Sequence, residues 1–288
     1  MPPRWRRRQQ CQPRSPRSTI VSTTWCAGVF ERAGGHRRSW RLRLAQWVAL
    51  CLLLGVWEFA VRAGGVNPLY LPTPSAIGAS MLELFQKGAL VRHTGITLGE
   101  FAAGYGAAVV AGMTGGVVLA LMPGLERFAS PYVAALMSVP KVAVVPLLAL
   151  WLGIGFGHKV AIVFLFSVFQ IHYSTLAGVK QARRDHLRVA QAFGASRGQV
   201  VRKVLLPSAV PTVFAALRVS ASVGLVGALF AEMLSSKAGL GNLLTRSAAA
   251  LDTPATFALV TVVTALAVAM VAALDLIERM FFLRWRLA

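Results

Sequence analysis

Carboxylates are scarce in this 288-residue sequence. It has 10 Asp and Glu residues against 30 Lys and Arg, and charged residues of both signs make up only 14% of the chain. No stretch pairs a nucleophile with a base or brings two carboxylates together at a catalytic spacing, so enzyme chemistry has no visible site. We therefore expect a protein that is not an enzyme and that holds no cofactor.

Cysteine is also rare. Cys11 and Cys26 lie in a basic N-terminal stretch, and Cys51 lies within an apolar run. Three cysteines so placed form neither a disulfide framework nor a metal-ligand spacing. The sequence therefore predicts no metal site.

Hydrophobic residues are what the chain has in abundance. They make up 56% of it, and the mean hydropathy is +0.62, which is too apolar for an ordinary soluble domain. We predict an all-α, polytopic membrane protein with about six transmembrane helices. The apolar runs cover about residues 44–61, 98–121, 129–152, 160–179, 209–233 and 255–276.

The net charge of +20 is unevenly distributed. Arginines crowd into the N-terminal tail and into the loop before Pro207, where they indicate membrane topology rather than nucleic-acid binding. With about six spans this charge bias predicts that both chain ends face the cytoplasm.

Composition divides the chain into four parts. We expect a disordered, basic cytoplasmic tail over residues 1–43, because too little of it can be buried to offset chain entropy. A twin-arginine signal at Arg6 and Arg7, or binding of the tail to anionic lipid or RNA, are alternatives. The first transmembrane helix should cover 44–62, and a periplasmic segment with a short amphipathic helix near 75–86 should cover 63–96. A transmembrane core should cover 97–288, with a cytoplasmic loop at 180–207.

The second apolar run has small residues at every fourth position. Gly104, Ala108, Gly112 and Gly116 leave one helix face almost without side chains. This pattern predicts close packing against another membrane helix.

Two further runs contain features that suit a solute pathway. Pro140 and Pro146 should break the third run, which membranes tolerate only beside protein or a cavity. The fourth run has an unusually polar half, in which uncharged groups could hold a hydrated solute. These candidate pathway residues are Gln170, His172, Tyr173 and Ser174. The glycines just before Lys159 lack the spacing of a phosphate-binding loop.

Residues 187–207, LRVAQAFGASRGQVVRKVLLP, form a basic interruption between two long apolar runs. They predict two short helices around Gly194, the second capped by Ser196 and carrying an apolar stripe at helical spacing. Such a helix suits a groove on another protein. Taken alone, it would suit the surface of anionic lipid equally well.

The spacing of Gly194, Val204, Leu206 and Pro207 resembles the pattern E-A-A-x-x-x-G-x(9)-I-x-L-P of binding-protein-dependent ABC import permeases. In that family the loop is a coupling helix that docks into the ATP-binding subunit. Ala190 agrees with the pattern, whereas Arg188 stands in place of the motif's Glu. The resemblance implies a docking loop formed by Arg188, Ala190, Gly194, Ala195, Ser196, Val204, Leu206 and Pro207.

Two more motifs resemble the nitrate, sulfonate and taurine branch of these permeases. They are L-P-T-P at 71–74, and A-E-M at 231–233 followed by G-L-G-N-L at 239–243. The resemblance implies a type I importer fold in a bacterial inner membrane, a dimer of identical permeases, two ATP-binding subunits and a periplasmic solute-binding protein. It also implies a small anionic solute such as a sulfonate, taurine or nitrate. Glu100 stands where many of these permeases carry arginine, so a pyrimidine or vitamin precursor remains an alternative.

A secondary carrier is the main rival function. It would need a carboxylate relay near the membrane midplane, whereas Glu58, Glu100, Glu232 and Asp275 are expected near the ends of spans. Glu232 is either a pathway carboxylate or an interfacial group at a helix end, and the sequence favours the second. The docking loop favours the importer, because a carrier needs no contact with a motor.

Overall fold

The computed structural model describes residues 35–181, 186, 189–190 and 192–286. Most of the expected disordered tail, and Arg188 of the expected docking loop, lie outside these residues. The described part is helical, without a strand. It divides into two units, Met1–Phe59 and Ala60–Ala288, and each is described by itself.

The described part of the first unit belongs to one helix, α2 (Gly35–Arg62), whose last residues enter the second unit. Its stretch Leu44–Arg62 is apolar and long enough to span a membrane, as predicted. Residues 35–43, which the sequence analysis assigned to the basic tail, belong to this helix.

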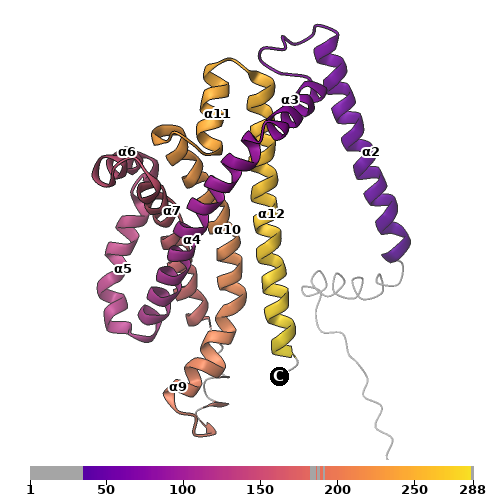
Figure 1. Cartoon of the computed structure of the whole chain (residues 1–288). Helices are drawn as coiled ribbons and strands as arrows, with labels where there is room; N and C mark the ends of the chain where they lie inside the picture. Colours follow the sequence, from indigo (N-terminus) through magenta and orange to yellow (C-terminus); the bar gives the residue numbers. More distant parts are fainter. Residues whose placement is uncertain (1–34, 182–185, 187–188, 191, 287–288) are drawn as a thin grey trace, which may run out of the picture. The chain divides into compact units, whose positions relative to one another are not determined.

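The second unit contains the remaining helices (Figure 1). In chain order they are α3 (Pro74–Gln86), α4 (Ala89–Leu121), α5 (Pro123–Ser138), α6 (Lys141–Leu152), α7 (Phe156–Lys180), α9 (Arg197–Val200), the π-helical turn η1 (Val201–Leu205), α10 (Leu206–Ser235), α11 (Leu240–Ala249) and α12 (Thr253–Arg286). The chain has five described helices long and apolar enough to cross a membrane, or six if α5 and α6 count as one broken span. The prediction of about six spans is confirmed.

The third span is broken at one of the two predicted prolines. Helices α5 and α6 meet at an angle of 91°, and the break falls at Val139 and Pro140. Pro146 lies inside α6 without ending it. A proline has no N–H to donate and crowds the preceding turn, so Pro140 suits the start of α6 better than its interior.

The segment before the core is shorter than expected. Helix α3 is present as predicted, and the Thr73 hydroxyl accepts from the Ala76 N–H at 3.2 Å to cap it. Helix α4 already begins at Ala89, nine residues before the predicted start of the second span. The additional turns at the start of α4 contain two polar residues, His93 and Thr97.

The core forms where α4, α7 and α10 pack together. The small-residue stripe of α4 lies against α7. A Cβ added at Gly104 would come within 2.5 Å of the Val160 carbonyl oxygen, and one at Gly116 within 2.7 Å of the His172 carbonyl oxygen. Gly112 faces Val168 in the same way, and Ala108 is fully buried. The backbones of α4 and α7 can approach this closely because the side chains between them are almost absent.

The second helix of the loop and the fifth span are one helix. Residues from Gly198 to Ser235 form a single helical stretch of 38 residues, which passes through the π-turn η1 into α10. The Leu206 N–H bonds to the Val201 carbonyl, five residues back, immediately before Pro207. A wider turn makes room for a proline ring that would otherwise clash with the preceding turn. The sequence predicted a separate short helix and a span beginning at Ala209, and this is corrected.

Helix α12 is also longer than predicted, and Asp275 lies inside it rather than at its end. Arg218 of α10 pairs with Asp275 at 2.8 Å and with Glu278. These ion pairs fasten α12 to α10.

Candidate functional site

The loop for which the sequence predicts docking turns at Gly194. Its φ of +70° lies in the left-handed region, where glycine carries no steric penalty, although a Cβ there would meet nothing within 4 Å. The Ala195 N–H bonds to the Ala190 carbonyl at 3.0 Å and closes the turn. The predicted turn at Gly194 is therefore present for a local backbone reason.

Ser196 caps the helix that follows. Its N–H bonds to Gln199 Oε1 at 2.8 Å, and its hydroxyl accepts from the Gln199 N–H at 3.4 Å. This reciprocal pair is a capping box, so the prediction that Ser196 caps the second helix is confirmed. Gln199 completes the cap, and the S-x-x-Q spacing was its signal in the sequence.

The loop presents apolar side chains to its surroundings. Phe193, directly before the turn, is 87% exposed, and Val189 is 55% exposed. Sequence reasoning concentrated on the motif positions and missed Phe193, although a lone aromatic residue in a basic loop was a visible signal. A large exposed ring at a rigid turn is a typical anchor for a protein partner.

The last motif residues face the bundle instead. Leu206 and Pro207 line an apolar cavity of about 370 Å³ with residues of α4, α7 and α10, among them Met113, Val179 and Phe214. Val204 is half-buried. The motif thus has two parts: the residues around Gly194 lie in the exposed turn, whereas Val204 and Pro207 are half-buried and Leu206, although 37% exposed, lines the cavity with Pro207.

The candidate pathway residues on α7 stay together on one helix. Tyr173 is 59% exposed, and Gln170 and Ser174 are partly exposed. His172 packs on α4, where a Cβ at Gly115 would come within 3.0 Å of its Nδ1. His172 and Tyr173 also line a small cavity of about 70 Å³ with residues of α5.

Glu232 does not join that group. It is fully buried, and its partners lie on other elements: Oε1 accepts from the Thr97 hydroxyl of α4 at 2.7 Å, and Oε2 accepts from the Gly241 N–H of α11 at 2.7 Å. Thr97 also accepts from the Leu240 N–H at 3.0 Å. The expectation of an interfacial group at a helix end is wrong, because the chain folds back over this carboxylate.

Two glycines let the chain pass close to Glu232. A Cβ at Gly239 would lie 2.1 Å from Glu232 Oε1, and a Cβ at Gly241 would lie 2.5 Å from the Leu229 carbonyl oxygen. His93 accepts from the Gly239 N–H at 2.9 Å. The G-L-G motif therefore has a structural reason, because only glycine leaves room for the backbone at the start of α11 to lie against the Glu232 side chain.

A second buried carboxylate lies near the same end of the bundle. Glu100 of α4 pairs with Lys159 of α7 at 2.5 Å, and both side chains are more than nine-tenths buried. His158 caps the start of α7 by accepting from the Gly155 N–H at 2.9 Å. Lys159 thus neutralises a carboxylate inside the protein, which explains a lysine after three glycines without any nucleotide.

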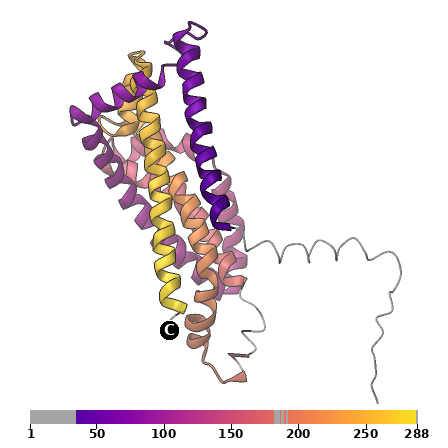
Figure 2. The ribbon, with the colours of Figure 1, turned by 90° about the vertical axis from the view of Figure 1, so that its right-hand side faces the viewer.

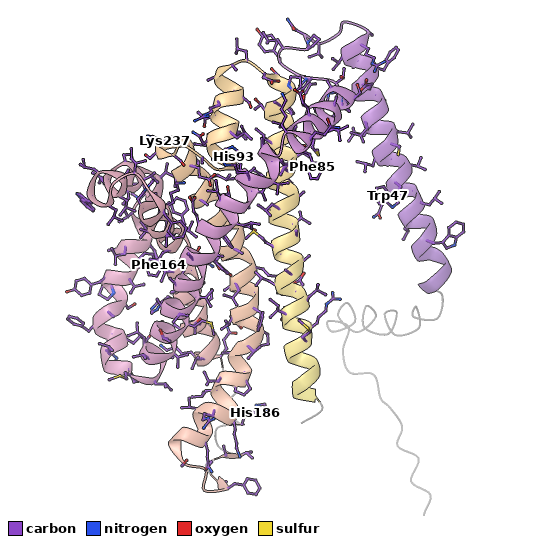
Figure 3. All side chains as sticks on the ribbon, viewed as in Figure 1. Trp47, Phe85, His93, Phe164, His186 and Lys237 are labelled. Carbon is purple, nitrogen blue, oxygen red and sulfur yellow. The ribbon has the colours of Figure 1, made fainter. Side chains whose placement is uncertain are left out.

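This end of the bundle also carries exposed cations. Arg92, Lys237 and Arg246 surround the His93 and Gly239 contact: Arg92 and Arg246 both act electrostatically on His93, and Arg246 donates to the Lys237 carbonyl at 3.4 Å. None of the three forms a salt bridge to a described carboxylate. Figure 3 shows His93 and Lys237 close together, at the opposite end of the ribbon from His186 of the loop. We call these three residues the outer basic cluster.

Comparison with known proteins assigns the chain to a family. A sequence model described as the binding-protein-dependent transport system inner membrane component matches residues 108–287, which is more than half of the chain. The chain belongs to this family. It is a membrane-spanning permease subunit of an ABC importer, a multi-pass protein and a component of a transporter rather than an enzyme.

Curated relatives of this permease agree. The chain is 31% identical to the taurine transport system permease protein TauC of Escherichia coli over 223 residues, covering 74% of this chain and 81% of the relative. It is 30% identical to the riboflavin transport system permease protein RibX of Chloroflexus aurantiacus, covering 83% and 88%. It is 26% identical to the aliphatic sulfonates permease SsuC of Bacillus subtilis, covering 75% and 77%.

Solved structures show the same fold. A chain of the inward-facing MetNI methionine ABC transporter superposes with a TM-score of 0.59 at 22% identity, covering 67% of this permease and 95% of that chain. The predicted type I importer fold and the branch of the family are therefore confirmed, and partners of the ATP-binding and solute-binding kinds follow from the family.

Proposed function

We propose that the loop around Gly194 docks into the ATP-binding subunit, where ATP is hydrolysed. The observation that carries this proposal is the exposed Phe193 ring on a turn fixed by Gly194 and by the Ser196 capping box. Rigid presentation lowers the entropy cost of binding, and a buried aromatic anchor supplies much of the affinity at an interface. Arg188 belongs to the same proposed contact and would meet a partner group of opposite charge.

Motion of the motor would reach the membrane along one helix. Because the helix after Ser196 runs without a break to Ser235, a displacement of the loop moves the inner end of α10 with it. At 1.5 Å per residue these 38 residues span about 57 Å, well beyond the roughly 30 Å of a hydrocarbon core. The docked loop thus acts as the end of a lever that switches the spans between inward and outward openings.

The opposite end of the bundle suits the solute-binding protein. Both views place the α9 loop and the α11 turn at opposite ends of the bundle, so a cytoplasmic loop puts α11 in the periplasm (Figures 1 and 2). With six spans, the charge bias of the sequence would put both chain ends in the cytoplasm. The outer basic cluster offers three unpaired cations to an acidic docking surface, which steers association by charge.

Two identical permeases would complete the pathway. Helix α5 has no buried residue within one chain, and Phe128 and Tyr132 are both largely exposed on it. Two members of the polar group of α7, His172 and Tyr173, line a small cavity together with residues of α5. A second copy against α5 would enclose these polar side chains between the two permeases, where a hydrated solute could pass.

We propose a small anionic or sulfonated solute. TauC and SsuC carry taurine and aliphatic sulfonates in their names, and another relative, at 27% identity, is a bicarbonate permease of Synechocystis. The outer basic cluster supports an anion. A vitamin or pyrimidine precursor is the second candidate, since RibX is named for riboflavin and ThiX of Halalkalibacterium halodurans for formylaminopyrimidine.

The docking proposal is tested with two matched glycine variants. Added Cβ atoms at Gly194 and at Gly198 would both meet nothing within 4 Å, but only Gly194 has a positive φ. Gly194→Ala therefore strains the turn by roughly 1–2 kcal/mol, whereas Gly198→Ala should stabilise its helix, because alanine favours helices more than glycine does. We expect Gly194→Ala to lower, and the bulkier Gly194→Val to abolish, co-purification of the ATP-binding subunit. Gly198→Ala should co-purify like the parent.

The same pull-down can contradict the proposal. Full co-purification and full ATPase stimulation by inserted Gly194→Val protein would remove the loop from the mechanism. The amphipathic loop would then belong on the lipid surface. Uptake of labelled taurine against labelled riboflavin, by cells that express the whole transporter, separates the two solute candidates.

A further inference from the structure

Glu232 is a buried carboxylate that has no role in the proposed solute pathway. It lies three residues before the end of α10, with no exposed surface, and no described cation forms a salt bridge with it. Burying such a group is costly unless each oxygen receives hydrogen bonds. Its oxygens are met by Thr97 and by the Gly241 N–H, from two other helices.

The loop beyond Glu232 is stiffened by its own hydrogen bonds. The Ser236 hydroxyl accepts from the Ala238 N–H at 3.2 Å, and the Asn242 side chain donates to the Ser236 carbonyl at 2.7 Å. Arg246 donates to the Lys237 carbonyl. A hydrogen bond therefore links Lys237, in the turn, to Arg246, in the last turn of α11; both are residues of the outer basic cluster.

Glu232 fastens this turn to the helix that ends in the docking loop. From Gly198 to Ser235 the chain is one helix, and the Glu232 side chain bonds to the backbone of α11 across the turn. Thr97 links both to α4, since its hydroxyl touches Glu232 and the Leu240 N–H. A displacement of either end of this helix would therefore move α4 and α11 through the hydrogen bonds of Glu232, and not only through the connecting loop.

We propose that Glu232, with Thr97, is a positioning joint that transmits docking at the outer basic cluster to the ATPase-docking loop. The proposal rests on the proposed function, because it takes the two ends of α10 to be the two partner surfaces. Glu232 touches no solute in this role. It sets how strongly the two surfaces are coupled.

Thr97 supplies the sharpest variants. Thr97→Val keeps the shape and removes the hydroxyl, and Thr97→Ser keeps the hydroxyl. Glu232→Gln keeps the size and replaces one acceptor oxygen by an N–H₂ donor. Glu83→Gln is the matched control, since Glu83 is an exposed carboxylate of α3 paired only with Lys87.

Two measurements are made on full-length permease. In lipid nanodiscs, deuterium uptake at the amides of residues 239–241 reports whether the joint holds the turn. In the transporter assembled with its ATP-binding subunit, the ratio of ATPase rates with and without solute-loaded binding protein reports coupling. A residue with only a structural role lowers yield and melting temperature, but leaves that ratio unchanged in the protein that survives.

We expect faster exchange at 239–241 in Thr97→Val and Glu232→Gln, and a stimulation ratio reduced by at least about fivefold, the lower end of usual coupling between two sites. Thr97→Ser and Glu83→Gln should match the parent in both measurements. Parent-like stimulation in Thr97→Val and Glu232→Gln overturns the proposal, and so does unchanged exchange at 239–241. If the parent itself binds no ATP-binding subunit, the proposed function fails, while the exchange measurement still decides whether Glu232 holds the turn.

Discussion

The two ends of the bundle treat their polar and apolar groups in opposite ways. At the α11 end, two carboxylates are buried and have partners within the chain: Glu100 pairs with Lys159, and Glu232 accepts hydrogen bonds from Thr97 and Gly241. At the loop end, the hydrogen bonds are local and the Phe193 ring is left almost wholly exposed. A closed polar network stabilises the subunit, whereas an exposed ring on a stiff turn is a surface that a partner covers.

The comparison is tested most strongly at Lys159. Replacing it by methionine leaves Glu100 buried without a cation, which typically costs about 3–5 kcal/mol. We expect Lys159→Met to lower the melting temperature in detergent sharply. The double variant Glu100→Gln with Lys159→Met should recover most of the loss, because no charge is then left unpaired.

An exposed ion pair serves as the control for this experiment. Lys87 and Glu83 are exposed on α3 and its end, and the Lys87 ammonium holds the pKa of Glu83 below its ordinary value. Such a pair favours folding above the unfolded pKa of the carboxyl, and the gain is lost as the pH falls through the lowered pKa. Because water screens it, Lys87→Met should change the melting temperature little. Equal losses for Lys159→Met and Lys87→Met would mean that burial at the outer end does not matter.

The loop end should respond in binding rather than in folding. Phe193→Ala removes a ring that is 87% exposed, so the melting temperature should stay unchanged. Its affinity for the ATP-binding subunit should fall by about 2 kcal/mol, roughly thirtyfold, as for an interface hot spot. Tyr70→Ala, which removes a ring that is 76% exposed in the segment before α3, is the control and should bind normally. Equal binding by the Phe193→Ala variant and the parent would show that the ring is not the anchor.

The packing between the two ends is tested by two glycines of α4 that lie two residues apart. A Cβ at Gly104 would collide with the Val160 carbonyl at 2.5 Å, whereas one at Gly106 meets nothing within 4 Å. Gly104→Ala should therefore cost about 1–3 kcal/mol by overpacking. Gly106→Ala should be neutral or stabilising by up to about 1 kcal/mol, since alanine favours a helix. Thermal unfolding of both variants decides, and a stable Gly104→Ala protein would place that face of α4 away from α7.

The smallest effect is expected at the cap of the loop helix. Ser196→Ala removes one half of the capping box and should cost about 1 kcal/mol of local helix stability. The ATP-binding subunit should then bind about fivefold more weakly, whereas Ser196→Asp, which also caps, should bind like the parent. An unchanged affinity of Ser196→Ala would mean that the partner itself, and not the cap, orders this helix.

Local features of the permease could be read from the sequence. The turn at Gly194, the cap at Ser196, helix α3 and the break at Pro140 each depend on neighbours a few residues away, and all of them are present. Phe193 was missed although its signal was local, because exposure of one ring depends on how the whole loop leaves the bundle. The length of α10 could not be predicted, because a proline usually marks a helix boundary and the π-turn that accommodates Pro207 has no sequence signature.

What the sequence determined by itself is the membrane class, the number of spans and the turn at Gly194, because hydrophobicity, charge bias and glycine or proline positions act along the chain. Only the tertiary structure decided what the buried charges do. Glu100 meets Lys159 across 59 positions, and Glu232 meets Thr97 across 135. The sequence carries no signal for pairs so far apart along the chain. Glu232 would be an interfacial group at a span end if α11 did not fold back over it.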